Sequence, residues 1–424
     1  MENTQLIKLD MNKETLKISK GRLYGKVKVS GAKNSALRLL AASILTGEQV
    51  ELNNFPNGLL DVQVHLDMLK VLGKDFTTAN DNVVITENNS TSTVLNWEGR
   101  SIRNTLLILG ALTARFGEGK VPLPGGCKLG ERKYDLHVML LEKLGAEVWE
   151  EGDFLCAKAK SERLKGNDIF LPMRSTGATE NAIICGSLSE GMTTVWNPHI
   201  RPEIMDLIDM LTKMGAKIRV YGQKCIVIEG SENLSGVKHA VIPDNMEALT
   251  WAIGSVITQG EVEIENFPYE HLEVPLVYLR ESGMKMYRGE NSLIVKGGEA
   301  YPVEISTGPY PGINSDMQPL FAVYGAMSQG ESKIIDLRFP RRYGYAEELA
   351  KMGMSYKVEG DLLVINGGNT LSGATVNALD LRAGIALLLA GLTAEGETII
   401  ENSWQIQRGY ENLMEKLKNL DVNI

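Results

Sequence analysis

The chain has 424 residues, a formal net charge of −9 and a hydrophobic content of 43%. This much apolar material excludes wholesale disorder, and the length suggests two or three domains. The longest nearly unbroken apolar stretch, Ile385 to Leu392, is far shorter than the roughly 20 residues of a membrane span. Residues 1–20 contain no apolar block typical of a secretory signal. We therefore expect a cytoplasmic protein with no membrane partner.

Charge and cysteine content narrow the kinds of partner. The sequence is acidic and contains no basic run of five residues, which argues against nucleic acid. A local group of arginines could still bind an anionic small molecule. The cysteines are far apart and form no CxxC pair, so we expect neither a disulfide framework nor a zinc site. They are Cys127, Cys156, Cys185 and Cys225.

A sixfold internal repeat runs along the whole sequence. Apolar stretches each end in a glycine that precedes an extended segment, and these glycines occupy positions 47, 117, 191, 260, 330 and 396. Each copy later carries an amphipathic segment, and in five copies this segment ends at a glycine suited to a left-handed helix C-cap. Those glycines are Gly73, Gly145, Gly215, Gly283 and Gly353, and the sixth copy has Asp421 there.

Each repeat of about 70 residues is expected to begin with a buried helix, because its apolar residues cover nearly every side. The expected helices are Ser35–Ile44, Asn104–Ala114, Asn181–Leu188, Leu249–Ile257, Leu320–Met327 and Ala383–Leu392. A strand, an amphipathic helix such as Pro202–Met214, and a second strand follow. A solenoid, a ring or two threefold domains could hold six copies. Only bundled helices with sheets outside bury each helix fully, so we predict two α/β domains of three repeats with a cleft between them.

Polar residues gather where these buried helices begin. A helix N-terminus offers unpaired N–H groups and a partial positive charge, which suit phosphate or carboxylate. At any one position, capping alone is the alternative explanation. Cations at such an end oppose the helix dipole unless an anion lies there, and four copies carry one. These cations are Lys33, Arg103, Arg174 and Arg382.

One further segment, 123–137, has the pattern of a reactive cysteine site. Two glycine-rich turns flank Cys127, and Lys128, Arg132 and Lys133 surround it with positive charge, which favours a reactive thiolate. The alternative is a turn cysteine with no role. Arg342 and Arg408 also stand out in the segments RFPRRYGY and IQRGYE, with solvated surface arginine as the alternative.

These motifs resemble the enolpyruvyl transferase family. They occur in the family's order nearly from end to end, and the cysteine loop is typical of the cell-wall branch rather than the shikimate branch. The matching segments are SGAKN (30–34), RFGEGKVPLPGGCKLGERKYDLH (115–137), STGATEN (175–181), VIPD (241–244), DMQ (316–318), DLRA (380–383) and RGYE (408–411).

The resemblance implies two inside-out α/β barrel domains, 33–242 and 1–32 with 243–424, and an active site in the interdomain cleft. It implies that the enolpyruvyl group of phosphoenolpyruvate is transferred to a hydroxyl of UDP-N-acetylglucosamine. The reaction releases phosphate, passes through a tetrahedral intermediate and commits the sugar to peptidoglycan synthesis. Small molecules would be the only substrates, with no metal and no organic cofactor.

The resemblance also implies roles for single residues. Cys127 would be the general acid at the methylene of phosphoenolpyruvate and the target of fosfomycin, and Asp316 the general base at the acceptor hydroxyl. Lys33, Arg132 and Arg408 would surround phosphoenolpyruvate with positive charge. Asn34 would contact the sugar. The other expected substrate-binding residues are Arg103, Arg342 and Arg382 in the cleft, Asp135 and Leu136 at uracil, and Ser175, Thr176 and Gly177 at the nucleotide phosphates.

Four segments depart from the usual family pattern, all on or near the acceptor side. The departures are Met173-Arg174 for Lys-Val, Lys133-Tyr134 for Pro-Val, Asn245 for Arg, and Arg338-Phe339-Pro340-Arg341-Arg342 for Val-Phe-Glu-Asn-Arg. Such changes can switch the acceptor, for example to UMP in a secondary-metabolite pathway, or can compensate one another. A non-catalytic UDP-sugar sensor is a third hypothesis, which the intact Cys127 and Asp316 disfavour.

Overall fold

The computed structural model describes residues 15–100, 102–124 and 134–422. It confirms the sixfold repeat, because every copy contains one buried helix followed by strands and a more exposed helix. The buried helices are α1 (Lys33–Ala42), α3 (Thr105–Phe116), α5 (Thr176–Leu188), α7 (Asn245–Ile257), α9 (Gln318–Met327) and α11 (Leu381–Thr393). In α11 all residues from Leu381 to Thr393 are buried, as expected for a helix with no polar side.

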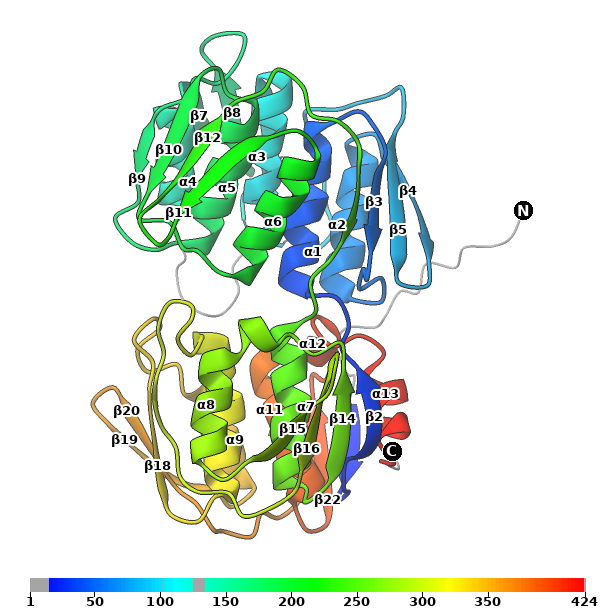
Figure 1. Ribbon diagram of the computed structural model, residues 1–424, viewed down its shortest axis with the longest axis vertical. Coiled ribbons are helices and arrows are strands. Elements are labelled where there is room, and N and C mark those ends of the chain that lie inside the picture. The colour runs from blue at the N-terminus through cyan, green and yellow to red at the C-terminus, as the bar shows by residue number, and fades with distance from the viewer. Residues whose placement is uncertain (1–14, 101, 125–133, 423–424) are drawn as a thin grey trace. The chain divides into compact units, whose positions relative to one another are not determined.

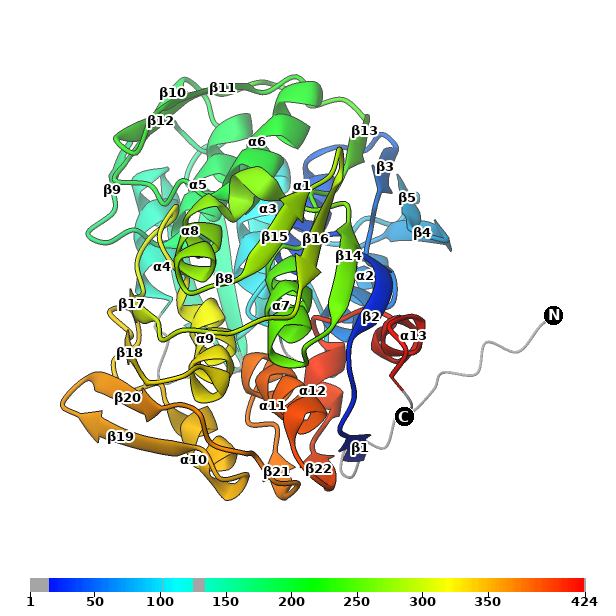
Figure 2. The same ribbon diagram turned by 60° about the horizontal axis from the view of Figure 1, so that its bottom comes forward.

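The chain divides into two compact units of three repeats. One unit is Ser30–Asp244, and the other consists of the described residues before and after that range. Each unit has its own hydrophobic core, which contains the apolar side chains of its three buried helices. Within a unit the sheets lie around these helices (Figure 1), and Figure 2 shows this for α7, α9 and α11. Helices inside and sheets outside confirm the predicted fold class.

The sheets share one topology. In the fifth repeat β18 (Glu331–Ile335) pairs in parallel with β17 (Glu304–Ser306) and antiparallel with β20 (Leu362–Asn366), which pairs with β19 (Ser355–Glu359). Three other sheets have the same order. They consist of β13 (Val237–Ala240), β3 (Val50–Asn53), β5 (Asn82–Glu87) and β4 (Lys74–Ala79); β9 (Asp168–Phe170), β10 (Met192–Trp196), β12 (Cys225–Glu229) and β11 (Lys217–Tyr221); and β2 (Tyr24–Lys28), β14 (Glu261–Glu265), β16 (Ser292–Lys296) and β15 (Lys285–Arg288).

Two sheets vary this plan. The second repeat has β6 (Glu118–Pro122), β8 (Phe154–Ala159) and β7 (Ala146–Glu151), and a parallel bridge from Val94 to Lys120 replaces its edge strand. In the sixth repeat β22 (Glu397–Glu401) pairs in parallel with β21 (Thr375–Asn377) and antiparallel with β1 (Thr15–Ser19). Strands from the start of the chain thus complete two sheets of the unit that ends it.

Five of the buried helices begin earlier than the apolar pattern predicted, and in α1 the difference is from Ser35 to Lys33. The expected start at Asn181 is wrong because α5 begins at Thr176, and α7 begins at Asn245 rather than Leu249. Likewise α9 and α11 begin at Gln318 and Leu381. The first turns are polar, so periodicity missed them. Side-chain capping stabilises two of these first turns: Ser175 accepts from the N–H of Ala178 in α5, and Asp380 accepts from the N–H groups of Arg382 and Ala383 in α11.

The exposed helices end as predicted at glycines in the left-handed region. Gly73, Gly145, Gly215, Gly283 and Gly353 have φ between 87° and 104°, and Asp421 in the sixth copy has φ 61°. These helices are α2 (Leu60–Val71), α4 (Asp135–Lys143), α6 (Pro202–Lys213), α8 (Glu273–Glu281), α10 (Gly344–Lys351) and α13 (Leu413–Asn419), and the short α12 (Trp404–Gln407) precedes the last one.

Among the described residues no helix is both long and apolar enough to cross a membrane. The exact limits of the two three-repeat domains, 33–242 and 1–32 with 243–424, stay a prediction.

Two of the C-cap glycines, Gly73 and Gly215, should differ in how well they tolerate substitution. A Cβ on Gly73 would lie 2.3 Å from the carbonyl oxygen of Ser90, whereas a Cβ on Gly215 would meet nothing within 4 Å. Both residues have positive φ, so Gly215→Ala costs about 1–2 kcal/mol of conformational strain. Gly73→Ala must in addition displace backbone and is expected to lower the melting temperature more. Equal losses would contradict this difference between the two turns.

Candidate functional site

Asp316 is the centre of a charged cluster in the unit that contains α7, α9 and α11. It lies in the one-turn helix η3 (Ser315–Met317), directly before α9, where the side chain of Asn314 accepts from the N–H of Asp316 at 3.0 Å. Its side chain is 34% exposed. The local turn therefore presents a carboxylate at the beginning of a buried helix while leaving it accessible.

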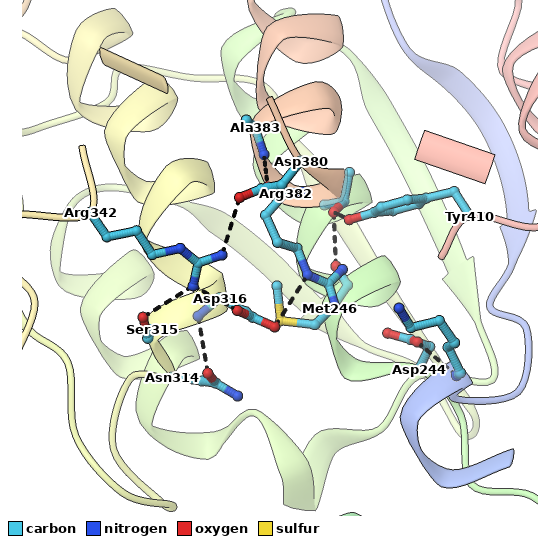
Figure 3. A network of polar contacts seen from close by, with 12 residues as sticks. Asp244, Met246, Asn314, Ser315, Asp316, Arg342, Asp380, Arg382, Ala383 and Tyr410 are labelled. Atoms are coloured by element: carbon cyan, nitrogen blue, oxygen red, sulfur yellow. Dashed lines mark hydrogen bonds and ion pairs between the residues drawn. The ribbon is translucent and has the colours of Figure 1, made fainter. Parts of the chain in front are cut away.

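Two arginines, one in the turn before α10 and one in α11, pair with this carboxylate (Figure 3). Nη1 of Arg342 donates to Oδ1 of Asp316 at 2.9 Å, and Nε of Arg382 lies 3.6 Å from Oδ2. The other arm of Arg342 reaches Asp380 at 3.4 Å. Burial by itself lowers the pKa of Arg342, but the charges of Asp316 and Asp380 outweigh it and raise that pKa above its ordinary value.

Arg382 lies in the first turn of α11 and is only 5% exposed. A cation there opposes the helix dipole. The structure supplies counter-charges from the protein itself, since Asp380 caps the same turn and Asp316 pairs with the guanidinium. Three of the predicted site residues, Asp316, Arg342 and Arg382, thus lie together.

Arg408, predicted at phosphoenolpyruvate, is the C-cap residue directly after α12, and its Nη1 donates to Oε1 of Gln405 at 2.9 Å. Its role at the substrate stays a prediction.

In the other unit, Lys33 is the first residue of α1 and is 8% exposed. Its Nζ donates to Oδ2 of Asp61 at 3.3 Å, and its backbone N–H donates to Asp244 at 3.2 Å. Arg100 lies 3.7 Å from the other oxygen of Asp61. The buried carboxylate of Asp61 on α2 thus compensates the positive charge of Lys33, the predicted substrate-binding lysine. The sequence did not reveal this pairing.

Arg103, Gly177 and His137 form a second group in that unit. His137, on α4, is 5% exposed and lies 3.1 Å from the side-chain amide of Asn181 on α5. Burial and the positive charge of Arg103 lower the pKa of His137 to about 3, so the imidazole is neutral. A Cβ on Gly177 would lie 3.2 Å from Nε2 of His137, so glycine gives the ring room.

The remaining predicted binding residues take positions at helix ends. Ser175 caps α5 through its Oγ, and the hydroxyl of Thr176 lies 2.8 Å from Nδ1 of His199. Asp135 is the exposed first residue of α4, and Leu136 follows it half-buried. The backbone oxygen of Asn34 accepts from Arg38 at 2.6 Å. The predictions for Cys127, Arg132 and Lys133 lie outside the described residues.

Three of the positions that depart from the family pattern contact other side chains of the protein. Arg174 donates to Asn197 at 3.3 Å, and Tyr134 bonds Glu150 through its hydroxyl. The guanidinium of Arg338 lies 5.6 Å from the centre of the Phe339 ring. Asn245 begins α7 and is 9% exposed, while Met173 is 43% exposed.

Comparison with known proteins identifies the family. The model of EPSP synthase, described as 3-phosphoshikimate 1-carboxyvinyltransferase, matches residues 18–417. The chain therefore belongs to this family of carboxyvinyltransferases, as the resemblance predicted.

Several relatives cover nearly the whole chain. A UDP-N-acetylglucosamine 1-carboxyvinyltransferase 2 of Carboxydothermus hydrogenoformans is 42% identical over 409 residues, which are 96% of this chain and 97% of that protein. A UDP-N-acetylglucosamine 1-carboxyvinyltransferase of Koribacter versatilis is 39% identical over 95% of this chain and 94% of its own length.

Solved structures share the fold. The enolpyruvyl transferase NikO from Streptomyces tendae has a TM-score of 0.87 at 24% identity, with 97% of this chain and 98% of that chain covered. EPSP synthase from Acinetobacter baumannii has a TM-score of 0.75 at 18% identity, with 96% of this chain and 98% of that chain covered. At these identities the likeness concerns the fold alone.

A buried histidine predicts how stability depends on pH. His65, on α2, is fully buried, and its Nδ1 lies 2.8 Å from the amide of Asn104. Burial, and secondarily Arg38, lower its pKa from 6.5 to about 3. Between these values the unfolded chain binds a proton that the folded chain does not. His65 therefore makes the free energy of unfolding fall as pH decreases below 6.5, by about 1.4 kcal/mol per pH unit.

Urea unfolding between pH 7 and pH 4 tests this expectation. His65→Gln removes the titrating group and should give a shallower loss than the wild-type chain. Parallel pH dependences in the two proteins would show that His65 does not titrate in this way.

Proposed function

We propose that the chain transfers the enolpyruvyl group of phosphoenolpyruvate to a hydroxyl of UDP-N-acetylglucosamine and releases phosphate, as a cytoplasmic step of peptidoglycan precursor synthesis. In the addition, the acceptor O–H bond breaks, its oxygen bonds C2 of phosphoenolpyruvate, and C3 gains a proton. In the elimination, the C2–O bond to phosphate breaks and C3 loses a proton. Family membership and the names of full-length relatives support this proposal.

The observation that carries it is the paired carboxylate of Asp316. A general base must be ionised and accessible, and Asp316 combines 34% side-chain exposure with two guanidinium partners. Arg342 holds it through a hydrogen bond and Arg382 through an ion pair, and the two arginines come from different segments. We assign Asp316 the proton of the acceptor hydroxyl, and Arg342 and Arg382 the role of binding the substrate anions.

Lys33, Arg132 and Arg408 would bind phosphoenolpyruvate and stabilise the negative charge of the tetrahedral intermediate. Lys33 is suited to this because it is buried at a helix N-terminus beside Asp61. Arg103, Asn34, Asp135 and Leu136 would bind the acceptor, with Ser175, Thr176 and Gly177 at its phosphates. The Ser175–Gly177 segment supports the last assignment because it opens α5, where unpaired N–H groups suit phosphate.

A second candidate acceptor is another nucleotide such as UMP. The observation in its favour is that Arg174 and Arg338 add positive charge, while Asn245 and Tyr134 replace usual family residues. Against it, Arg174 and Tyr134 are each bonded within the protein, to Asn197 and Glu150.

Phosphate release from phosphoenolpyruvate tests the proposal. The purified chain should release phosphate rapidly with UDP-N-acetylglucosamine and not with UMP. Asp316→Asn keeps the shape of the side chain but removes the base, and it should lower kcat by about 100-fold or more. Release with UMP alone would favour the second candidate, and release with neither acceptor would contradict both.

The cysteine loop gives an independent prediction. If Cys127 donates the proton to C3, Cys127→Ala should lose turnover, whereas Cys127→Asp retains an acidic group and should keep part of it. Fosfomycin should inactivate the wild-type chain and leave Cys127→Asp unaffected. Unchanged turnover in Cys127→Ala would remove this residue from the mechanism.

A further inference from the structure

We propose that Asp336 is a positioning residue of the proposed reaction, which holds the turn that bears Asp316 and the turn that bears Arg342 in one geometry. Its carboxylate is 1% exposed. The predicted effects on turnover rest on the proposed function. The predicted effect on the two turns does not, and it can be tested without substrate.

Five donors converge on this carboxylate. Oδ2 accepts from the hydroxyl of Ser315 at 2.5 Å and from Nε2 of Gln318 at 2.5 Å. Oδ1 accepts from the hydroxyl of Thr307 at 2.8 Å and from the backbone N–H groups of Arg338 and Phe339, each at 2.9 Å. Full satisfaction of a buried carboxylate makes the geometry around it rigid.

These donors come from the segments that carry the charged cluster. Ser315 directly precedes Asp316, and Arg338 and Phe339 begin the turn that leads to Arg342. Ser315 also joins the two, because its Oγ donates to Asp336 and accepts from Nη1 of Arg342 at 3.3 Å. A displacement of the Asp336 carboxylate would therefore move both partners of the Asp316–Arg342 pair.

Most of the other repeats carry an amide rather than a carboxylate at this position. Asp336 directly follows the last residue of β18, and four other repeats have asparagine directly after the equivalent strand. The asparagines, with φ between 48° and 59°, donate from their side-chain amides to the end of the parallel edge strand or the residue after it. They are Asn54, Asn197, Asn266 and Asn402. Asp336 reverses this polarity, because it accepts where they donate.

This reversal gives a sharp test. Asp336→Asn introduces the residue that four other repeats carry, but its amide nitrogen would face donors, so a purely structural role predicts a less stable chain whose folded form has normal turnover. A positioning role predicts that kcat falls about 100-fold, since small misplacements of reacting groups have such effects. KM should change much less. The acid limb of the kcat–pH profile should move to higher pH, because Asp316 loses the hydrogen bond from Arg342 that favours its charged form. The other charged groups around this pair are Arg382 and Asp380.

Tyr324→Phe is the matched control. Tyr324 is fully buried on α9, and its hydroxyl bonds the backbone oxygen of Ser282 at 2.9 Å, away from the first turn of the helix. This variant should lose stability but keep the kcat and the pH profile of the wild-type chain.

Ser315→Ala keeps the proposal testable if Asp336→Asn does not fold. It removes the hydroxyl that joins Asp336 to Arg342 and should shift the pH profile in the same direction, and Ser315→Thr should restore it. Hydrogen exchange at the N–H groups of Arg338 and Phe339 needs no substrate and should accelerate in Asp336→Asn but not in Tyr324→Phe. Unchanged exchange, or normal kcat and pH profile in folded Asp336→Asn, would overturn the proposal. Absence of turnover in the wild-type chain would contradict the proposed function instead.

Discussion

Six helices that have no polar side must be covered on all sides, and this constraint determines where the chemistry can lie. Because the flanks of α1, α3, α5, α7, α9 and α11 are buried in two cores, functional polar residues can occupy only the ends of these helices. Lys33, Ser175, Asp316 and Arg382 all lie in or directly before a first helical turn. The N–H groups there add to the attraction for anions.

Internal carboxylates stabilise the cations at these ends. Lys33 pairs with Asp61, and Arg382 lies near Asp316. Breaking such a buried pair costs several kcal/mol, because one charge is left without compensation. The same carboxylates keep the lysine and arginines in fixed positions, which suits residues that are to bind charged substrates without reorganisation. Asp316 has two roles: it pairs with Arg342 and Arg382, and its partly exposed carboxylate can accept a proton.

The sequence predicted the repeats, the buried helices and their glycine C-caps, because periodicity and glycine positions are local signals. It placed the start of α5 five residues late, because capping rather than apolar spacing holds Thr176 in the helix. The assignments of Asp316 and Cys127 came from a resemblance to a family, and Cys127 lies outside the described residues. The partners of Lys33 and Ser315 could not be predicted, because they lie far away in the sequence. Asp61 is 28 positions from Lys33, and Asp336 is 21 positions from Ser315.

Asp336 nevertheless has a signal in the sequence. Aligned on the strand that follows each buried helix, four repeats show asparagine, the second shows Leu123 and the fifth shows Asp336. The aspartate is the one acidic residue at this position among the six repeats. Only the structure reveals its partners, because five donors meet at Asp336 from segments that periodicity does not connect.

The most direct test of the account is the fate of the C3 hydrogens of phosphoenolpyruvate when the reaction runs in D₂O with UDP-N-acetylglucosamine. Addition followed by elimination passes through a methyl group at C3, so the account predicts deuterium in the vinyl group of the product, seen by mass spectrometry and NMR. A vinyl product without deuterium would contradict it, because a direct displacement leaves these hydrogens untouched.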